Sequence, residues 1–349
     1  MNKKFDFDDI LLMPSALTTI NSRYSDINPK YDIRDTPRYP LIAAPMDTVI
    51  DENNVYTFSK RGINVCVPRT VKNQYDLDTP TFTFKSYSLQ DFTAAVENVD
   101  DLPSHILIDV ANGHMQSIID ICKKAKKQYS NLYIMVGNIA NPKTYEIYAD
   151  ANCIDAIRLG IGNGNGCLST KQLLIGYPMA SLINETRKIK DLRRGGPVII
   201  ADGGMKNYSD IIGALALGAD YVMLGSILNK AFESSGKFYI QNRTDSYEQV
   251  NSSQAKQILD NGDTVYKMFR GMSTKEVQRE MGRSEDELKT SEGVVRYRPV
   301  EYYLKDWIEN FDHYLRSAMS YCNARTLDEF IGKAEFNFIT ESAYRRFDK

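Results

Sequence analysis

The chain has 349 residues, of which 42% are hydrophobic and 25% charged, so it can bury a substantial core in one large domain or two small ones. A formal net charge of −2 and a pI of about 6.0 exclude the general attraction to nucleic acids and anionic membranes that a basic chain would have. The five cysteines contain no CxxC pair and the three histidines show no metal-ligand spacing, which argues against a structural zinc site. No signal-peptide core and no apolar run of roughly 18 residues occurs, so we expect a cytoplasmic protein with reduced thiols.

Eight short apolar runs rich in β-forming residues recur along the chain, most of them followed by a longer amphipathic segment. The runs cover residues 41–46, 63–68, 82–88, 106–110, 132–137, 155–161, 197–204 and 220–226. They are almost continuously hydrophobic, as strands covered on both faces should be. This alternation predicts an α/β fold, a single (β/α)₈ barrel domain over residues 1–349.

The amphipathic segments have helical periodicity, and they cover residues 53–62, 89–99, 115–129, 142–151, 179–194 and 208–219. The alternation stops after Ser226. Residues 232–300 are polar, and we interpret them as an insertion that carries a mobile active-site flap. Helical periodicity returns in residues 302–321.

Active-site residues of such barrels lie on the loops at the carboxyl ends of the strands. In this chain those loops are rich in glycine and polar residues. They cover residues 45–48, 109–113, 160–170, 202–204 and 224–226.

The loop GIGNGNGCLST at residues 160–170 is the most distinctive of these segments. A G-x-G-x-x-G dinucleotide fingerprint would need glycine at Asn165, and the loop follows the sixth strand rather than the first, so that motif is absent. The glycines allow close backbone approach, which favours a ligand-contacting loop over a plain turn. Cys167 is either a small buried hydrophobe or a nucleophile, and Ser169 could supply a proton-transferring hydroxyl.

The other strand ends leave similar alternatives. Asp202-Gly203-Gly204 and Gly225-Ser226 end the seventh and eighth strands, where barrels of this kind bind phosphate through backbone N–H groups, although ordinary turns also contain such glycines. An aspartate at a strand end, such as Asp109, is as often a helix cap as a functional group. Glu292, in the insertion, could be a solvated charge.

Taken together, these segments resemble the inosine-monophosphate dehydrogenase and guanosine-monophosphate reductase family over nearly the whole chain. The matching segments agree in order and spacing. They are PMDTV at 45–49, IDVANGH at 108–114, VGN at 136–138, the loop at 160–169, GYP at 176–178, IADGG at 200–204, VMLGS at 222–226, RGMS at 270–273 and SEG at 291–293. The resemblance implies a homotetramer of (β/α)₈ barrels that binds a purine nucleoside monophosphate.

Several features favour the reductase branch of the family. The segment between the strands at 63–68 and 82–88 has no room for the CBS-type regulatory repeats that the dehydrogenases usually carry. IDVANGH and GYP look like the reductase versions of those segments. Glu292 lies 21 positions after Gly271, as in the reductases, and no Arg-Tyr pair of the kind that activates water in the dehydrogenases lies between them.

The resemblance therefore implies an NADPH-dependent reductive deamination of GMP to IMP and ammonia. The thiolate of Cys167 would attack C2 of the guanine ring, and Ser169 and Glu292 resemble the hydroxyl–carboxylate pair that protonates the departing ammonia. The covalent thioimidate then accepts a hydride from NADPH at C2, and expulsion of the thiolate gives IMP.

The same resemblance assigns the binding residues. Substrate contacts would come from Asn165, Asp202, Gly203, Gly204, Gly225, Ser226, Gly271, Met272, Ser273, Ser291 and Gly293. Contacts with the nicotinamide cofactor would come from Ser22, Arg23, Arg69, Asp109, Val110, Ala111, Ile161 and Gly162. Backbone carbonyls of Gly162, Gly164 and Cys167 would ligate a monovalent cation, K⁺.

The chain departs from the family pattern at several of these positions. Asn165 stands where the family usually has serine, Ser169 where it has threonine, and Arg69, after Pro68, where it has lysine after histidine. Leu288 and the lysine after it replace a Tyr-Arg pair. Three alternatives therefore stay open: a reductase of a modified or deoxy purine nucleotide, a dehydrogenase that oxidises IMP to XMP with NAD, and a nucleotide-binding protein without turnover.

Overall fold

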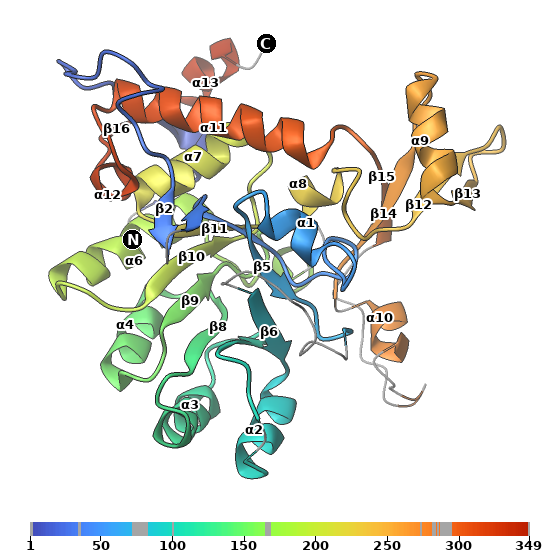
Figure 1. The fold of residues 1–349 in the computed structure, drawn as a ribbon. Coiled ribbons are helices and arrows are strands. Elements are labelled where there is room, and N and C mark those ends of the chain that lie inside the picture. Colours follow the sequence, from blue (N-terminus) through green and yellow to red (C-terminus); the bar gives the residue numbers. More distant parts are fainter. Residues whose placement is uncertain are drawn as a thin grey trace.

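A computed structural model describes residues 3–33, 36–71, 83–99, 101–164, 169–272, 274–280, 284, 286 and 295–347. Its centre is a closed barrel of eight parallel strands in the order β10-β11-β4-β5-β6-β7-β8-β9 (Figure 1). The strands are β4 (Leu41–Ala43), β5 (Asn64–Val67), β6 (Thr83–Tyr87), β7 (His105–Asp109), β8 (Tyr133–Ile139), β9 (Ala156–Leu159), β10 (Val198–Asp202) and β11 (Tyr221–Leu224). Each predicted apolar run overlaps one of them, so the predicted (β/α)₈ fold is confirmed.

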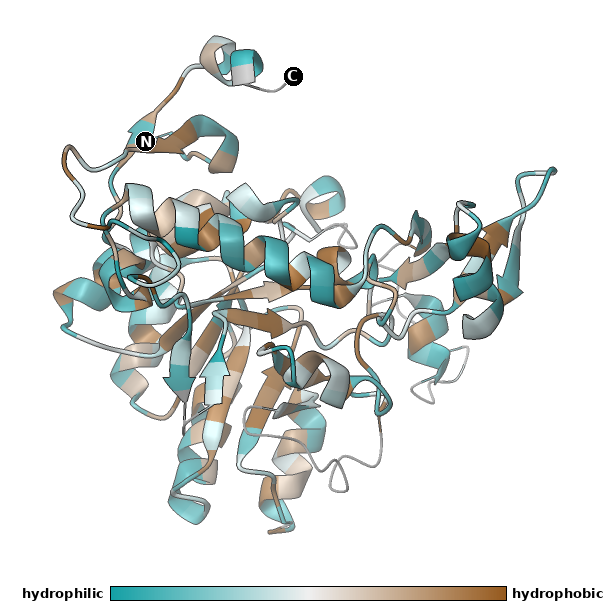
Figure 2. Cartoon of the chain, turned by 45° about the horizontal axis from the view of Figure 1, so that its top comes forward, coloured by the Kyte–Doolittle hydropathy of each residue, from teal (hydrophilic) through white to brown (hydrophobic). Residues whose placement is uncertain are grey.

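The barrel strands are buried on both faces. Alternate residues point to opposite sides of a strand, so Ile200 and Met223 point into the barrel, whereas Ile199 and Val222 pack outward. The inward residues form a core of their own, and the outward residues form a second core with the surrounding helices. Figure 2 shows the consequence: the strands are the most hydrophobic part of the chain, and the outer faces of the helices are hydrophilic.

The helices around the barrel lie where helical periodicity predicts them. They are α1 (Val55–Ser59), α2 (Leu89–Glu97), α3 (Gln116–Gln128), α4 (Pro142–Ala151), α6 (Met179–Leu192), α7 (Tyr208–Leu217) and α11 (Leu304–Tyr321). Their ends follow from local side-chain chemistry. For example, Asn207 caps α7 by accepting a hydrogen bond from the backbone N–H of Asp210 at 2.9 Å, and the helix stops at Gly218, whose φ of 119° suits glycine.

Two aspartates repeat one arrangement at the amino ends of the strands. Oδ2 of Asp155, just before β9, accepts hydrogen bonds from the backbone N–H of Ile134 and from Lys126 Nζ, both at 2.7 Å. Oδ2 of Asp220, just before β11, accepts from the backbone N–H of Ile199 and from Lys190 Nζ, also at 2.7 Å. Each aspartate thus joins its own strand to the neighbouring strand and to a helix.

The insertion at residues 232–300 contains an antiparallel sheet of order β13-β12-β14-β15, which projects to one side of the barrel (Figure 1). Its elements are β12 (Phe238–Gln241), β13 (Tyr247–Val250), α9 (Ser252–Asp260), β14 (Tyr266–Arg270), α10 (Lys275–Glu280) and β15 (Val295–Pro299). The sequence analysis predicted a polar insertion here but no sheet. The mobility of a flap within it stays a prediction.

The remaining elements lie on the outside of the barrel. Strand β1 (Ile10–Leu12) pairs antiparallel with β16 (Phe336–Phe338). The backbone N–H and the hydroxyl of Ser181, in α6, form hydrogen bonds with the backbone of Phe5. The other elements are the 3₁₀ helix η1 (Phe7–Asp9), β2 (Tyr31–Ile33), β3 (Thr36–Arg38), α5 (Ser169–Leu173), α8 (Ser226–Asn229), α12 (Leu327–Phe330) and α13 (Glu341–Phe347).

Candidate active site

Three charged side chains from three strands meet inside the carboxyl end of the barrel. Arg158 of β9 donates from Nη1 to Asp109 Oδ1 at 2.7 Å, and from Nη2 to Asp202 Oδ2 at 2.7 Å. Asp109 ends β7 and Asp202 ends β10, so the arginine links strands on both sides of its own strand. We call these three residues the mouth cluster.

The position of Arg158 follows from the alternation along β9. Ala156 points into the barrel, so Arg158, two residues further on, does too. The neighbouring strand makes room with Gly137, where a Cβ atom would lie 2.4 Å from Cβ of Arg158. Although only 6% of Arg158 is exposed, its two carboxylate partners compensate its charge. Burial alone would lower the pKa of Arg158, but Asp202 and Asp109 raise it above its ordinary value, so the guanidinium stays charged.

The carboxylate of Asp202 has one fully used oxygen and one available oxygen. Oδ2 accepts from Arg158 Nε at 3.1 Å, from Arg158 Nη2 and from Asn138 Nδ2 at 2.8 Å. Oδ1 accepts no hydrogen bond from the described residues. Because a carboxylate oxygen can accept about two hydrogen bonds, Oδ1 can receive a pair of hydroxyl groups from a ligand.

Arg69 adds a second guanidinium to the cluster. It follows β5, and its Nε lies 3.6 Å from Asp109 Oδ2, which is an ion-pair distance but too long for a good hydrogen bond. Nε is buried and makes no hydrogen bond with the described residues. A buried donor without a partner is costly, so this side chain is suited to an anionic or polar ligand group.

The glycine-rich loop after β9 packs on the end of β10. Gly162 has φ +82°, and a Cβ there would lie 1.9 Å from Oγ1 of Thr170. Gly203 has φ +86°, and a Cβ there would lie 3.1 Å from the backbone nitrogen of Gly164. Two loops predicted to bind ligand are therefore in direct contact, and their glycines allow that contact.

The ends of β4 and β11 also meet at the mouth. A Cβ on Gly225 would lie 2.7 Å from the sulfur of Met46, so the loop after β4 lies against the start of α8. Ser226 is the first residue of α8. On the insertion, Arg270 at the end of β14 binds Asp47, which brings the neighbouring Gly271 and Met272 to the same side.

The predicted cofactor residues of β7 and the loop after β9 lie beside the mouth cluster. Val110 donates its backbone N–H to the carbonyl of Gly137 at 3.0 Å, and its own carbonyl accepts from the backbone of Asn138. Ala111 is exposed, and Ile161 lies in the loop that joins Gly160 to Gly162. These residues follow the strands that carry Asp109 and Arg158.

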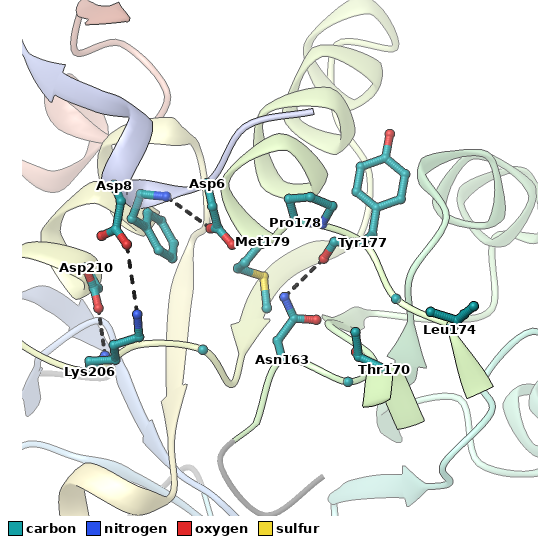
Figure 3. Close-up of a pocket in the computed structure, with 14 residues that line it drawn as sticks. Asp6, Asp8, Asn163, Thr170, Leu174, Tyr177, Pro178, Met179, Lys206 and Asp210 are labelled. Carbon is teal, nitrogen blue, oxygen red and sulfur yellow. Dashed lines mark hydrogen bonds and ion pairs between the residues drawn. The ribbon is translucent and has the colours of Figure 1, made fainter. Parts of the chain in front are cut away.

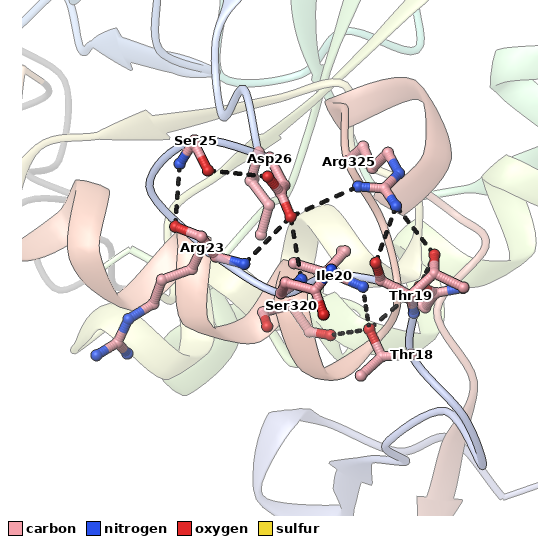
Figure 4. A network of polar contacts seen from close by, with 12 residues as sticks. Thr18, Thr19, Ile20, Arg23, Ser25, Asp26, Ser320 and Arg325 are labelled. Atoms are coloured by element: carbon pink, nitrogen blue, oxygen red, sulfur yellow. Dashed lines mark hydrogen bonds and ion pairs between the residues drawn. The ribbon is translucent and has the colours of Figure 1, made fainter.

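Ser22 and Arg23 lie elsewhere on the chain. Arg23 Nη1 donates to the hydroxyl of Ser317 on α11 at 2.5 Å, and the backbone N–H of Ser22 donates to Asp26. Figure 4 shows the polar network around Asp26, in which Oδ2 of Asp26 lies 4.0 Å from Nη1 of Arg325. The contacts of Ser22 and Arg23 are therefore with their own segment and with α11, not with the strand ends of the mouth cluster.

Several predicted residues lie outside the described part of the chain. They are Asn165, Cys167, Ser273, Ser291, Glu292 and Gly293. Ser169, by contrast, is described: it is buried and begins α5.

Three of the four described cysteines lie in the barrel and outer core and are poor nucleophiles. Cys66 lies inside the barrel beneath the mouth cluster, and Cys122 and Cys153 lie in the outer core. Burial raises the pKa of all three thiols above the ordinary value. Because the thiolate is the reactive form, these cysteines are structural.

A cavity of about 470 Å³ adjoins the glycine-rich loop (Figure 3). It lies between η1, the loop after β9 and the start of α7, and Asn163 borders it while donating to the carbonyl of Tyr177 at 3.0 Å. Of the predicted site residues, Gly162 and Gly204 line this cavity. It therefore lies beside the mouth cluster rather than on it.

The sequence analysis missed three residues that hold the site together: Arg158, Asn138 and Arg270. Arg158 had a usable signal, because a charged residue within the apolar run DAIRLGI must be buried in a barrel strand. Asn138 and Arg270 had their place in the matching segments VGN and RGMS as a signal, but nothing there indicated their partners.

Two features are absent from the described residues. No group of three or more His, Cys, Asp or Glu side chains is placed to hold a metal ion. Among the same residues, no helix combines the length and the apolar character that a membrane span requires.

Comparison with known proteins gives one consistent result. The sequence model of the IMP dehydrogenase / GMP reductase domain matches residues 88–347. Similar proteins include GMP reductase 2 of Homo sapiens, with 26% identity over 97% of this chain and 95% of the relative. Others are the GMP reductases of Caenorhabditis elegans, with 24% identity (97% and 92%), and of Streptococcus pyogenes serotype M5 (strain Manfredo), with 27% identity (93% and 92%). The domain match covers most of the chain, and Asp109, Arg158 and Asp202 of the mouth cluster all lie within the matched residues. The chain therefore belongs to the IMP dehydrogenase / GMP reductase family.

Proposed function

We propose that this protein is an NADPH-dependent GMP reductase, which converts GMP to IMP and ammonia. The relatives named GMP reductase, similar over nearly the full length of the chain, support this assignment. The observation that carries it on the structural side is the mouth cluster, where Asp202 Oδ1 is available for ligand hydroxyl groups. The proposed substrate is therefore a purine nucleoside monophosphate with its ribose at Asp202.

The nucleotide would be held mainly by backbone groups. Gly203 and Gly204 adopt positive φ angles and lie against the loop after β9, so backbone N–H groups there can approach a phosphate closely. Gly225 and Ser226 would add contacts from the end of β11. Asn165, Ser273, Ser291 and Gly293 keep their proposed substrate contacts, and Gly271 and Met272 would line the purine end.

The chemistry would centre on Cys167. Its thiolate adds to C2 of the guanine ring, Ser169 and Glu292 deliver the proton with which ammonia leaves, and a thioimidate remains on the sulfur. NADPH, when bound, supplies the hydride that reduces C2. Return of the electron pair to sulfur then releases IMP and restores the thiolate.

The cofactor end of the site would be formed by Arg69 and Asp109. The buried Nε of Arg69 has no hydrogen-bond partner among the described residues and suits a polar or anionic group of the cofactor, which supports this assignment. Val110, Ala111, Ile161 and Gly162 would complete the contact surface. Arg23 binds α11 of its own chain and Ser22 binds Asp26 beside it, so these two residues would contact a cofactor held by a neighbouring subunit of the proposed homotetramer.

Two further assignments belong to this proposal. The backbone carbonyls of Gly162, Gly164 and Cys167 would hold K⁺, and the enzyme would act in the cytoplasm. Activity measured with K⁺ replaced by Na⁺ or Li⁺ would test the cation site.

The test of the proposed function is a turnover screen. GMP, dGMP, IMP, XMP and AMP are each mixed with NADPH or NADH, and loss of nicotinamide absorbance and release of ammonia are followed. We expect oxidation of NADPH with GMP and one ammonia per turnover, both abolished in Cys167→Ala. No oxidation with any guanine nucleotide would overturn the proposal, and NADH formation from IMP and NAD would replace it with the dehydrogenase reaction.

A further inference from the structure

Arg270 is the charged residue through which the insertion is attached to the barrel mouth. It is the last residue of β14, and its Nε donates to Asp47 Oδ2 at 3.1 Å. Its Nη1 donates to Glu280 Oε1 at 3.0 Å, and its Nη2 donates to both carboxylates. One guanidinium therefore joins a barrel loop, the end of a strand and the end of helix α10.

The loop that carries Asp47 holds the beginning of the insertion as well. The carbonyl of Asp47 accepts from the Ser235 hydroxyl at 2.7 Å. The buried amide of Asn229 donates to the carbonyls of Thr48 at 2.8 Å and Met268 at 3.1 Å. Both ends of the segment that leads into β14 are thus anchored on the same loop, and Arg270 is its ionic anchor.

The two ionic arms of Arg270 differ in exposure. The Asp47 arm is buried, with 11% of the Arg270 side chain and 14% of the Asp47 side chain exposed. Glu280, in contrast, is 53% exposed. Removing one partner of a buried ion pair destabilises the fold strongly. Exposed pairs contribute little to stability and are screened by salt. Arg270 is therefore held firmly by Asp47, and its contact with Glu280 is the weaker and more easily broken of the two.

We propose that Arg270 is a positioning residue of the reaction: it fixes Gly271, Met272 and helix α10 against the loop after β4, and Glu280 tightens that arrangement. The proposal rests on the proposed function, because Gly271 and Met272 are placed there at the purine end of the substrate. Arg270 touches neither substrate nor cofactor. It acts by holding the residues that do so.

The test compares Glu280→Gln with Glu276→Gln in the intact protein. Glu276 lies on the same helix and is exposed, so its variant makes the same change of charge without touching Arg270. We expect Glu280→Gln to raise the KM for GMP by about two- to fivefold with little change in kcat, because the lost contact is worth no more than an exposed ion pair. Glu276→Gln should match the wild type, and thermal unfolding should be unchanged in both variants.

Salt separates positioning from a general effect on the fold. Raising the salt concentration should bring the KM of the wild type and of Glu276→Gln towards that of Glu280→Gln, because salt screens the exposed arm. Amide hydrogen exchange without nucleotide gives a readout independent of activity: α10 should exchange faster in Glu280→Gln than in Glu276→Gln. Faster exchange with an unchanged KM would overturn the proposal, and so would equal exchange in the two variants.

Arg270→Lys tests the fork geometry. A lysine keeps the charge but cannot donate to both carboxylates in the way a planar guanidinium does. We expect a larger rise in KM than in Glu280→Gln, by tenfold or more, and a wild-type KM would contradict the proposal. A wild-type protein that turns over no purine nucleotide would instead refute the proposed function, while the exchange difference in α10 would persist.

Discussion

Two nitrogens of Arg158 donate to the same oxygen of Asp202: Nε lies 3.1 Å and Nη2 lies 2.7 Å from Oδ2. The third nitrogen, Nη1, extends to Asp109. None of the described residues donates a hydrogen bond to Asp202 Oδ1, whereas Oδ2 carries the contacts that support the barrel. In the proposed function, ligand contact would therefore fall to Oδ1.

Removing the arginine should destabilise the barrel strongly. Arg158→Met would leave two aspartates in a largely buried site without their positive partner, and we expect a loss of about 3–5 kcal/mol in the free energy of unfolding. Urea denaturation measures this loss. Glu97→Gln breaks the exposed pair with Lys124 and should cost less than about 1 kcal/mol. A loss of similar size in both variants would contradict the ionic role of Arg158.

A methyl group at Gly137 should displace the same arginine. In Gly137→Ala the new Cβ would lie 2.4 Å from Cβ and 3.0 Å from the carbonyl oxygen of Arg158, so strand β8 or β9 must shift. We expect a destabilisation of about 1–3 kcal/mol, as for other overpacked cores, and a reduced affinity for GMP. Calorimetric titration with GMP, run beside urea denaturation, measures both. An unchanged free energy of unfolding and an unchanged affinity for GMP would show that β8 and β9 can move apart without cost.

The proposed nucleophile should be the reactive thiol at neutral pH. Iodoacetamide should label Cys167 and spare Cys66, Cys122 and Cys153, whose burial raises the pKa of each thiol. Peptide mass spectrometry identifies the labelled residue, and GMP should protect it. Cys167→Ala should lower kcat at least about a thousandfold, whereas Cys322→Ser should leave it unchanged. Labelling of another cysteine with parallel loss of activity would refute this role.

Lys267 should make stability depend on pH. It lies on β14 and is buried within the insertion, where its Nζ donates to the carbonyl of Ser234 and lies 4.1 Å from the ring centre of Phe238. Burial lowers the pKa of Lys267 from 10.5 to about 7. Between these values the unfolded chain binds a proton that the folded chain does not, so this lysine makes the folded state more stable as the pH rises through that window, by about 1.4 kcal/mol per pH unit.

Unfolding free energies measured from pH 7 to pH 9 test this slope. The wild type should gain stability relative to Lys267→Met over this range. Exposed Lys237 provides the control, since Lys237→Met should run parallel to the wild type. A pH-independent difference between Lys267→Met and the wild type would mean that the lysine keeps its proton in the fold.

The barrel was predictable because its signal is repeated. Each strand is a short apolar run and most of the runs are followed by a segment of helical periodicity, so the repeated pattern outweighs an error at any one position. The sheet of the insertion lacked that signal. The sequence of β13, Tyr247-Glu-Gln-Val250, does not alternate apolar and polar residues, and the strand is only partly buried. Tertiary contacts among strands far apart in the sequence hold such a sheet together, and these leave little trace in composition.

The glycines and aspartates at strand ends could be placed at the carboxyl end of the barrel from the sequence, but their roles as site residues stay predictions. Asp109 and Asp202 both bind Arg158. The charge of Arg158 within an apolar run indicates a buried arginine, but the sequence does not show which carboxylates are its partners. Asn138 was equally hidden, since an amide has no fixed role until its neighbours are known. Cys167 and Glu292 remain predictions.

The contacts of Asp155 and Asp220 lie at the amino ends of the strands, opposite the mouth cluster. In each, an aspartate accepts hydrogen bonds from a backbone N–H of the neighbouring strand and from a lysine of a helix. These contacts help to fix the register of the barrel away from the proposed site. Substitutions at the carboxyl ends of the strands, where the mouth cluster lies, therefore do not remove the contacts that fix the register at the amino ends.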